Sequence, residues 1–365
     1  MKITSTEIVK LTIPMEPFVI ATETCYEAKN IYLRITTDEG LIGVGECSAF
    51  PMLVGETQET CFAVAKDLAR IIKGKNPIDI NERMNELHAY IAFNGTIKSA
   101  FDMALHDIAS KEKQIPLYRF LGGTKKKIQT DLTIGINTPE NMASTAIKYV
   151  NDGVQIIKVK LGKKADEDIE RIKQIRLAIG NDITLRIDAN QGWSYDTALY
   201  TLNQLSKYNI QFCEQPIHHH LDLLLPELKK QVTIPIMADE SVFDHFDAER
   251  LIKANACDSI NIKLAKSGGI LEAIRIANTA ESFNIPCMLG GMTESRLALT
   301  AKVHLAMSHQ NIKFYDLDTC LLGQKEDPVL HGARYNNYFL EIDETPGIGA
   351  DINPDYIETA EKAVI

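Results

Sequence analysis

Polar residues recur at almost even intervals through the middle of the chain, each at the end of a short β-like run. The series comprises Lys158, Lys160, Asp188, Glu214, Asp239 and Lys263. The steps from Lys160 onward are 28, 26, 25 and 24 residues (160 to 188, 188 to 214, 214 to 239, 239 to 263). Because side chains alternate faces along a strand, Lys158 and Lys160 point the same way. The spacing indicates a repeating β/α unit that delivers one polar position per strand.

Beyond residue 125 short β runs alternate with amphipathic helical stretches, a pattern typical of a parallel sheet with crossover helices. Strands are predicted near 130–135, 155–160, 183–188, 210–214, 234–239, 258–263, 285–289 and 313–318. Eight strands favour a barrel. A doubly wound sheet would show a Gly-rich first turn, and the nearest candidate, Gly43-Val44-Gly45, lacks the third glycine and falls in a predicted hairpin. The expected fold class is α/β, with a modified TIM barrel of (β/α)7β type.

The first 125 residues show a different pattern of strands and helices. Alternating β patterns at 2–13, 30–37 and 41–47, with a turn at 38–40, predict an antiparallel sheet. Helical patterns follow at 56–73, 79–92 and 96–112. We therefore expect an α+β capping domain at 1–125, a catalytic barrel at 126–320 and a C-terminal segment, 321–365, that returns to the cap. A barrel of about 250 residues plus a cap suits a chain of 365.

Composition narrows the class of protein. The formal charge of −10 argues against a nucleic-acid partner, since such proteins usually carry a basic face. Seven cysteines occur singly and without a CxxC pair, which disfavours a disulfide framework and indicates a reducing compartment. No apolar run approaches the roughly 20 residues that span a bilayer, and no signal-like segment starts the chain. A cytoplasmic protein without a membrane partner is expected.

Three carboxylates end successive predicted strands, namely Asp188, Glu214 and Asp239. Active sites of such barrels lie at the carboxyl ends of the strands, where these side chains would converge. Convergent carboxylates repel unless a cation lies among them, and hard oxygen ligands favour Mg²⁺, with Mn²⁺ as a substitute. Any one of them alone would more simply cap the following helix. Three in succession favour a metal site.

Lysines face the same end of the predicted barrel. Lys158 and Lys160 lie on the second strand and Lys263 on the sixth, at opposite sides of the ring. Neighbouring positive charge and burial lower a lysine pKa, as a base requires. Two opposed bases can remove a proton from one face of a carbon and return it to the other. The alternatives are a structural ring of ion pairs and a lysine that forms a Schiff base. Lys266 is assigned to the solvated surface.

These residues, together with Lys263-Leu-Ala-Lys-Ser-Gly-Gly269, resemble the enolase superfamily over nearly the whole chain, in particular its muconate-lactonizing subgroup. A lysine or histidine base acting with Mg²⁺ is known chemistry of that superfamily. The resemblance implies abstraction of a proton α to a carboxylate through a metal-bound enediolate. Residue by residue, it implies metal ligation by Asp188, Glu214 and Asp239, acid/base catalysis by Lys160 and Lys263, neutralisation of the substrate carboxylate by Lys158, and substrate contacts at Thr133 and Gly291. The seventh strand, 286–292, has no histidine, which disfavours the mandelate-racemase-like subgroup.

The eighth predicted strand carries Asp316 and Asp318, which would share a face and bind an ammonium group. Within the subgroup this pair resembles that of dipeptide epimerases, such as the L-Ala-D/L-Glu epimerases, and implies a dipeptide as the small-molecule partner. The alternative is a pair that only ends the strand and caps a helix. Other open functions are cycloisomerisation, o-succinylbenzoate synthesis, a Schiff-base lyase and a dipeptide-binding protein without turnover. A homo-oligomer is compatible with all of them.

Side-chain preference is predicted from residues 14–25, which are expected to form a cap loop after the first strand. This loop contains no Lys or Arg, whereas relatives that favour a C-terminal glutamate are similar in placing an arginine there. We expect a preference for dipeptides with a neutral or hydrophobic second residue, in a pocket formed from Phe18, Ile20, Phe50, Met52 and Leu53. The run His218-His219-His220 lacks the ligand spacing of a zinc site and is assigned to a loop. Trp193 is assigned to packing.

Overall fold

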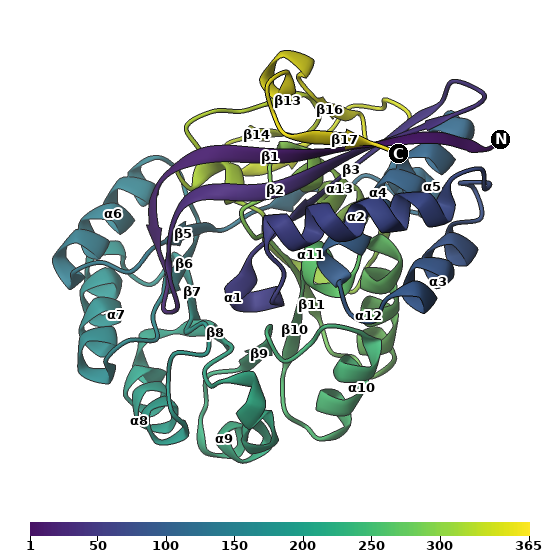
Figure 1. Cartoon of the computed structure of the whole chain (residues 1–365). Helices are drawn as coiled ribbons and strands as arrows, with labels where there is room; N and C mark the ends of the chain where they lie inside the picture. The colour runs from purple at the N-terminus through teal and green to yellow at the C-terminus, as the bar shows by residue number, and fades with distance from the viewer.

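Eight parallel strands form the barrel of the computed structural model, which describes residues 1–365 (Figure 1). They are β5 (Leu132–Ile134), β6 (Ile156–Lys160), β7 (Thr184–Asp188), β8 (Ile210–Glu214), β9 (Ile236–Ala238), β10 (Ser259–Ile262), β11 (Cys287–Gly290) and β12 (Ile312–Asp316). Neighbours in the ring are neighbours in the sequence. All eight strands fall in the regions that the sequence predicts.

Helices connect successive strands and surround the barrel (Figure 1). They are α6 (Pro139–Asn151), α7 (Ala165–Ile179), α8 (Tyr195–Leu205), η1 (Ser206–Tyr208), η2 (His219–Leu224), α9 (Leu225–Gln231), α10 (His245–Lys253), α11 (Leu264–Ser267), α12 (Ile270–Ser282) and α13 (Arg296–Ser308). After β12 the short turn η3 (Thr319–Leu321) stands where an eighth barrel helix would begin. Seven helical connections between eight strands confirm the (β/α)7β prediction.

The ring is nearly closed, and its seam lies between β5 and β12. These two strands form no ladder with each other. Three bonds cross the seam: Asp131 N donates to Tyr315 O at 3.3 Å, Leu317 N to Thr130 Oγ1 at 2.8 Å and Thr133 N to Asp318 Oδ2 at 2.7 Å. One backbone bond and two bonds to side chains therefore join the two strands where the regular ladder stops.

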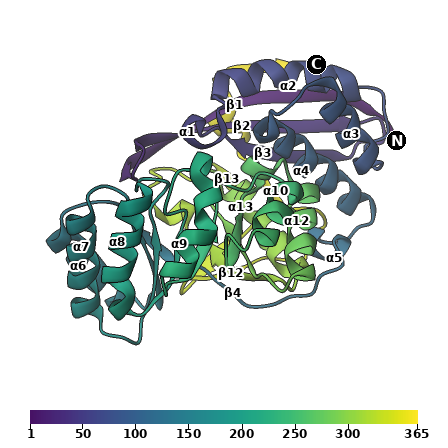
Figure 2. The ribbon, with the colours of Figure 1, turned by 90° about the horizontal axis from the view of Figure 1, so that it is seen from below.

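The cap is an antiparallel sheet covered by helices. Its strands are β1 (Ile3–Val19), β2 (Thr24–Thr37), β3 (Ile42–Ser48) and β17 (Lys362–Val364), in the order β17-β1-β2-β3. Its helices are α1 (Pro51–Val54), α2 (Gln58–Ile72), α3 (Ile80–Tyr90), α4 (Gly95–Glu112) and α5 (Leu117–Phe120). The cap lies to one side of the barrel, seen most clearly in Figure 2.

The first two strands are longer than predicted. Residues 14–25, expected as a loop, are mostly a paired ribbon with its turn at 20–23, and pairing resumes at Phe18 with Cys25 after a register shift that begins at Pro14. Cross-strand hydrogen bonds extend the ribbon through a stretch whose sequence does not alternate cleanly. In Figure 1 the ribbon bends towards the open end of the barrel.

Gly43 and Gly45 allow α4 to pack directly on the backbone of β3. A Cβ at Gly43 would lie 2.2 Å from Ala104 O, and one at Gly45 would lie 2.0 Å from Ala100 O. A close backbone approach of this kind is one of the two reasons for glycine within a strand. The Gly-Val-Gly run thus serves packing in the cap.

The C-terminal segment pairs with both parts of the molecule. Its strands are β13 (Val329–His331), β14 (Arg334–Asn336), β15 (Phe339–Glu341) and β16 (Ala350–Ile352), followed by η4 (Pro354–Ile357) and β17. β15 pairs with β4 (Ile128–Gln129), just before the barrel, and β17 pairs with β1. The return to the cap is confirmed, while the boundaries at 125 and 320 remain a prediction.

Two apolar cores hold these layers. The larger surrounds the barrel strands, between them and the outer helices, and the smaller lies between the cap sheet and α2, α3 and α4. Burial of apolar surface supplies the main driving force for this arrangement. None of the helices combines the length and apolar character that a membrane crossing requires.

Candidate active site

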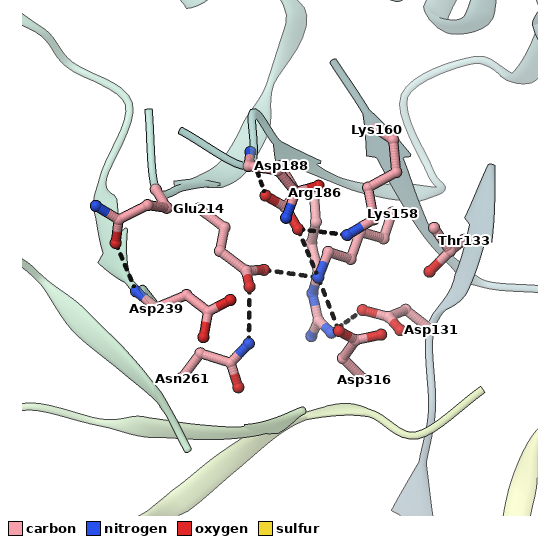
Figure 3. A network of polar contacts seen from close by, with 12 residues as sticks. Asp131, Thr133, Lys158, Lys160, Arg186, Asp188, Glu214, Asp239, Asn261 and Asp316 are labelled. Atoms are coloured by element: carbon pink, nitrogen blue, oxygen red, sulfur yellow. Dashed lines mark hydrogen bonds and ion pairs between the residues drawn. The ribbon is translucent and has the colours of Figure 1, made fainter. Parts of the chain in front are cut away.

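Five residues of the predicted charged series lie close together, namely Lys158, Lys160, Asp188, Glu214 and Asp239 (Figure 3). Asp188 and Glu214 are the last residues of β7 and β8, and Lys160 ends β6. The sheet register places Lys160 beside Asp188 and Asp188 beside Glu214. Asp239 and Lys263 directly follow β9 and β10. Strand order therefore arranges the side chains along an arc.

Each candidate base is paired with a different acid of this arc. Lys160 Nζ lies 2.6 Å from Asp188 Oδ2, and Lys263 Nζ lies 2.6 Å from Asp239 Oδ2. Lys158 Nζ lies deeper, at 2.7 Å from Glu214 Oε2, 2.7 Å from Asp316 Oδ2 and 3.1 Å from Asp188 Oδ2. The two bases thus stand at the two ends of the row of carboxylates.

Lys266 is not on the surface, so that prediction is wrong. Its side chain is buried, its Nζ lies 2.7 Å from Asp239 Oδ1, and it also donates to Asn261 O. The short helix α11 turns the side chain inward, a direction that sequence spacing after Lys263 does not reveal. Asp239 thereby binds two lysines, one through each oxygen.

The cavity above these residues is lined from both the barrel and the cap. The empty space within it, counted out to its open mouth, is about 700 Å³. The polar lining includes Lys160, Lys263, Asp316, Asp318, Thr133, Gly291, Asn190, Gln191 and Glu240, and the apolar lining includes Phe18, Ile20, Phe50, Met52 and Leu53. The three predicted metal ligands and Lys158 lie beneath the lining. The five apolar residues therefore lie where the specificity prediction needs them.

Two aspartates mark one side of the cavity. Asp316 ends β12 and pairs with Lys158, whereas Asp318 lies in the turn before η3 and accepts the hydrogen bond from Thr133 N. Simple strand alternation does not relate them, because the strand ends at Asp316. Their carboxylate oxygens nevertheless lie within 4.8 Å of one another and of Asp131. Burial and the charge of Asp316 raise the pKa of Asp318 to about 7.

Asp131 and Arg186 belong to this network and were missed by the sequence reasoning. Arg186 Nη1 donates to Asp131 Oδ2 at 2.7 Å, and the guanidinium lies over the rings of Phe212 and Phe314. A signal was present, because Arg186 stands two residues before Asp188 and must share its inward face. The pair places a further buried charge of each sign beneath Asp316.

The donor set fits a divalent cation. Asp188, Glu214 and Asp239 are fully buried. Glu240 Oε2 accepts no hydrogen bond, and Glu214 Oε2 has only its ion pair with Lys158. Burial, reinforced by the charge of Asp188, raises the pKa of Glu214 to about 7; burial and Asp239 raise that of Glu240 to about 8. The carboxylate oxygens of Asp188, Glu214 and Asp239 lie farther from one another than those of Asp131, Asp316 and Asp318. Lysine ammonium groups lie among them. Carboxylate oxygens are the ligands that Mg²⁺ prefers, so Asp188, Glu214 and Asp239 are suitable ligands for it.

Charge balance supports the same fit. The buried acids around the site are Asp131, Asp188, Glu214, Asp239, Glu240, Asp316 and Asp318, and the buried bases are Lys158, Lys160, Arg186, Lys263 and Lys266. Seven acids against five bases leave a formal charge of −2 when all are ionised. Buried charges require compensation, and a divalent cation supplies that amount.

The histidine run and the tryptophan lie outside the charged arc. His218 precedes η2, and its ring stacks on that of His219, which meets the ring of His220 edge-on. His219 Nδ1 lies 2.7 Å from Gln191 Oε1. The loop assignment holds for His218 alone, because His219 and His220 begin η2; one ring nitrogen from each of the three histidines lies within 4.8 Å of the others. Trp193 is buried and donates from Nε1 to Asp168 Oδ2 at 2.9 Å, in agreement with a packing role.

Comparison with known proteins assigns both parts of the chain. Residues 3–122 match the family model of the mandelate racemase / muconate lactonizing enzyme N-terminal domain. Residues 141–356 match the enolase C-terminal domain-like model. The chain is 46% identical, over all of both chains, to the D-Ala-D/L-Ala epimerase of Cytophaga hutchinsonii. It is 38% identical to the hydrophobic dipeptide epimerase of Enterococcus faecalis, over 92% of this chain and 95% of that one.

Solved structures agree with this placement. The dipeptide epimerase of Cytophaga hutchinsonii, complexed with Mg and the dipeptide D-Ala-L-Val, superposes over all of both chains with a TM-score of 0.98. The N-succinyl Arg/Lys racemase of Bacillus cereus, 32% identical, superposes over all of both chains with a TM-score of 0.97. With the barrel, the cap and the charged arc described above, these matches show that the chain belongs to the enolase superfamily, in its mandelate racemase / muconate lactonizing enzyme family.

Proposed function

We infer that the chain is a Mg²⁺-dependent dipeptide epimerase that inverts the α-carbon of the second residue. The relatives reported above are epimerases and a racemase, so the chain is an isomerase. The observation that carries the proposal is the cavity itself: Lys160 and Lys263 reach it from opposite ends of the carboxylate row, and Asp316 and Asp318 line it. Two bases and two acids suit a substrate with a carboxylate and a free ammonium group.

The residues divide the work as follows. Asp188, Glu214 and Asp239 would hold the ion, which when bound stabilises the negative charge that develops on the substrate carboxylate. Lys158 adds positive charge beneath the same position. One of Lys160 and Lys263 takes the α-proton, and the other gives a proton to the opposite face. Asp316 and Asp318 hold the ammonium end through charge-assisted hydrogen bonds, while Thr133 and Gly291 contact the backbone of the dipeptide.

The second residue of the substrate is proposed to be neutral or hydrophobic. The apolar lining and the absence of Lys and Arg from 14–25 support this preference. A buried carboxylate without a basic partner is costly, so a C-terminal glutamate would be disfavoured. Activity with Mn²⁺, a cytoplasmic location and a homo-oligomer also remain proposals.

The proposal is tested with the purified chain in D₂O, Mg²⁺ and a dipeptide library. We expect α-deuterium incorporation and inversion at the second residue for Ala-Ala and Ala-Val, slower reaction with Ala-Glu, and loss of both when a chelator removes the ion. Turnover that survives the chelator, with an adduct trapped by borohydride, would instead support a Schiff-base lyase. Binding without exchange would support a dipeptide-binding protein.

A racemase of N-succinyl amino acids is the main competing reaction, because such a relative shares the whole fold. Its substrate carries a carboxylate in place of the free ammonium group. The buried acids Asp316 and Asp318 would repel that group. N-succinyl-arginine therefore serves as the negative control, and faster turnover of it than of any dipeptide would reverse the assignment.

A further inference from the structure

One wall of the cavity follows a barrel strand in the sequence, but residues of the cap form hydrogen bonds with it. This pocket wall consists of Gly291, Met292 and Thr293, which follow β11 and line the cavity. It lies directly against the proposed ammonium site: a Cβ at Gly291 would lie 2.3 Å from Thr319 Oγ1 and 3.3 Å from Asp316 O. A displacement of the wall would therefore alter the space available to the dipeptide at that end.

Two buried cap residues bind Thr293. Ser48 Oγ, at the end of β3, lies 2.9 Å from Thr293 Oγ1 and accepts a hydrogen bond from Thr293 N at 3.3 Å. Asn30 Nδ2, on β2, donates to Thr293 O at 3.3 Å. Neither cap residue lines the cavity.

Glu46, on β3, binds the residues that follow the wall. Its Oε1 accepts from Ser295 N at 2.8 Å and from Asn30 Nδ2 at 2.8 Å. Its Oε2 accepts from Ser295 Oγ at 2.7 Å and from Ala298 N at 3.0 Å. Glu46 is 1% exposed. Four donors surround the carboxylate, and two of them are backbone N–H groups at the start of α13.

The barrel fixes the wall from the other side. Glu294 Oε2 accepts a hydrogen bond from Met292 N at 2.7 Å, and Glu294 Oε1 forms a buried ion pair with Lys302 of α13. The wall is thus clamped between α13, which carries Lys302, and the cap, which carries Asn30, Glu46 and Ser48. Buried hydrogen-bond networks rigidify the segments they join, and in this one Asn30 Oδ1 is left without a partner.

We propose that Glu46 and Ser48 are positioning residues that set the pocket wall for binding of the dipeptide, an inference that rests on the proposed function. They touch neither the lysines nor the acids of the metal site. Their loss should weaken binding more than it slows the proton transfer. Through these two residues the cap would affect substrate binding without direct contact. The apolar residues of the ribbon and α1, in contrast, line the cavity themselves.

The test compares Glu46→Gln and Ser48→Ala with the unaltered chain in saturating Mg²⁺, using the exchange kinetics of Ala-Ala. Glu46→Gln puts an amide donor among four donors and should raise KM about tenfold. Ser48→Ala removes only the contacts with Thr293 and should raise KM about threefold to fivefold. In both variants kcat should stay within about threefold, a split that general destabilisation does not produce. If Glu46→Gln fails to fold, the KM of Ser48→Ala alone tests the positioning role.

Asp107→Asn is the matched control. Asp107 is also a fully buried cap carboxylate that accepts two backbone hydrogen bonds, from Val44 N and Ile348 N, but neither donor segment reaches the cavity. The Asp107→Asn variant should have a lower unfolding temperature and an unchanged KM. Unchanged KM in both test variants, or an equal rise in the control, would overturn the positioning role alone. An unaltered chain without any dipeptide exchange would overturn the proposed function and this role together.

Discussion

Single residues in the site are arranged in two similar pairs. Lys160 opens to the cavity and shares Asp188 with the deeper Lys158, while Lys263 opens to the cavity and shares Asp239 with the deeper Lys266. Burial opposes the charged form of Lys263, but Asp239 and Glu214 outweigh it and raise its pKa, opposite to the lowered pKa predicted for a base. Each proposed base therefore has a second cation and a carboxylate behind it.

Separate removal of the two bases tests the two-base arrangement. Lys160→Ala and Lys263→Ala should each lower net epimerisation by about 10²- to 10⁴-fold, since each removes a general acid/base. Each variant should exchange the α-proton of only one configuration of the second residue, and the two variants should differ in which configuration that is. Mass spectrometry in D₂O measures the exchange. The exposed Lys163→Ala is the control and should keep full activity. Equal residual exchange of both enantiomers in each variant would exclude opposed bases.

The ammonium site is tested at Asp318. Asp318→Asn keeps an oxygen for Thr133 N but loses the charge, so the KM of Ala-Ala should rise about tenfold to a hundredfold. The same change should reduce the preference of the enzyme for Ala-Ala over N-acetyl-Ala-Ala. Initial rates with both substrates measure the effect. An unaltered preference would place the ammonium elsewhere.

Among the elements, β3 requires glycine at two positions because α4 packs directly against its backbone. Gly45 has no room for a side chain against Ala100 O. Gly45→Ala should therefore lower the free energy of unfolding by about 1–3 kcal/mol or more, as overpacking does, measured by urea denaturation. Gly40→Ala, in the turn before β3 at φ +80 with open space around it, should cost only about 1 kcal/mol. A smaller loss at Gly45 than at Gly40 would contradict this packing.

The helix α13 carries a buried histidine that should report on acid stability. His304 lies between Tyr118 N, which donates to Nδ1, and Ile348 O, which accepts from Nε2, and burial lowers its pKa to about 4. The unfolded chain binds this proton near the ordinary value of 6.5, so stability is complete above pH 6.5 and declines as the pH falls towards 4. The contribution is about 3 kcal/mol, and His304→Gln should flatten the dependence over that interval in urea denaturation. An identical pH slope in the variant would show that another group is responsible.

For the molecule as a whole, the buried site should couple metal binding to stability. The formal surplus of two negative charges around the arc is relieved by a divalent ion, so Mg²⁺ at a hundred times its dissociation constant should stabilise the fold by about 2.7 kcal/mol. Differential scanning calorimetry with and without a chelator measures the shift. Glu214→Gln removes a proposed ligand and should abolish most of it. A full shift in that variant would place the ion at another site.

Much of the fold was predictable because each barrel strand is short, regular and followed by a polar residue at its end. All eight barrel strands, the three long cap helices and the (β/α)7β order follow from local patterns. The sequence pattern misplaces Lys266 and does not reveal Arg186 and Asp131, because their roles depend on a helical turn and on partners from distant strands. It also predicts a loop at 14–25, because the pairing partner of this ribbon, and not its own pattern, makes it a strand.

By itself, the sequence determined the repeating β/α unit, the identity of the charged residues and the order in which they meet at one end of the barrel, because strand periodicity and chain order are local properties. Only the tertiary structure decided which lysine pairs with which acid, that the seam of the ring is closed by the side chains of Asp318 and Thr130, and that the cap holds the pocket wall through Glu46 and Ser48. These are contacts between residues far apart in the chain, often hundreds of positions, and packing of the complete fold is what brings them within hydrogen-bond distance.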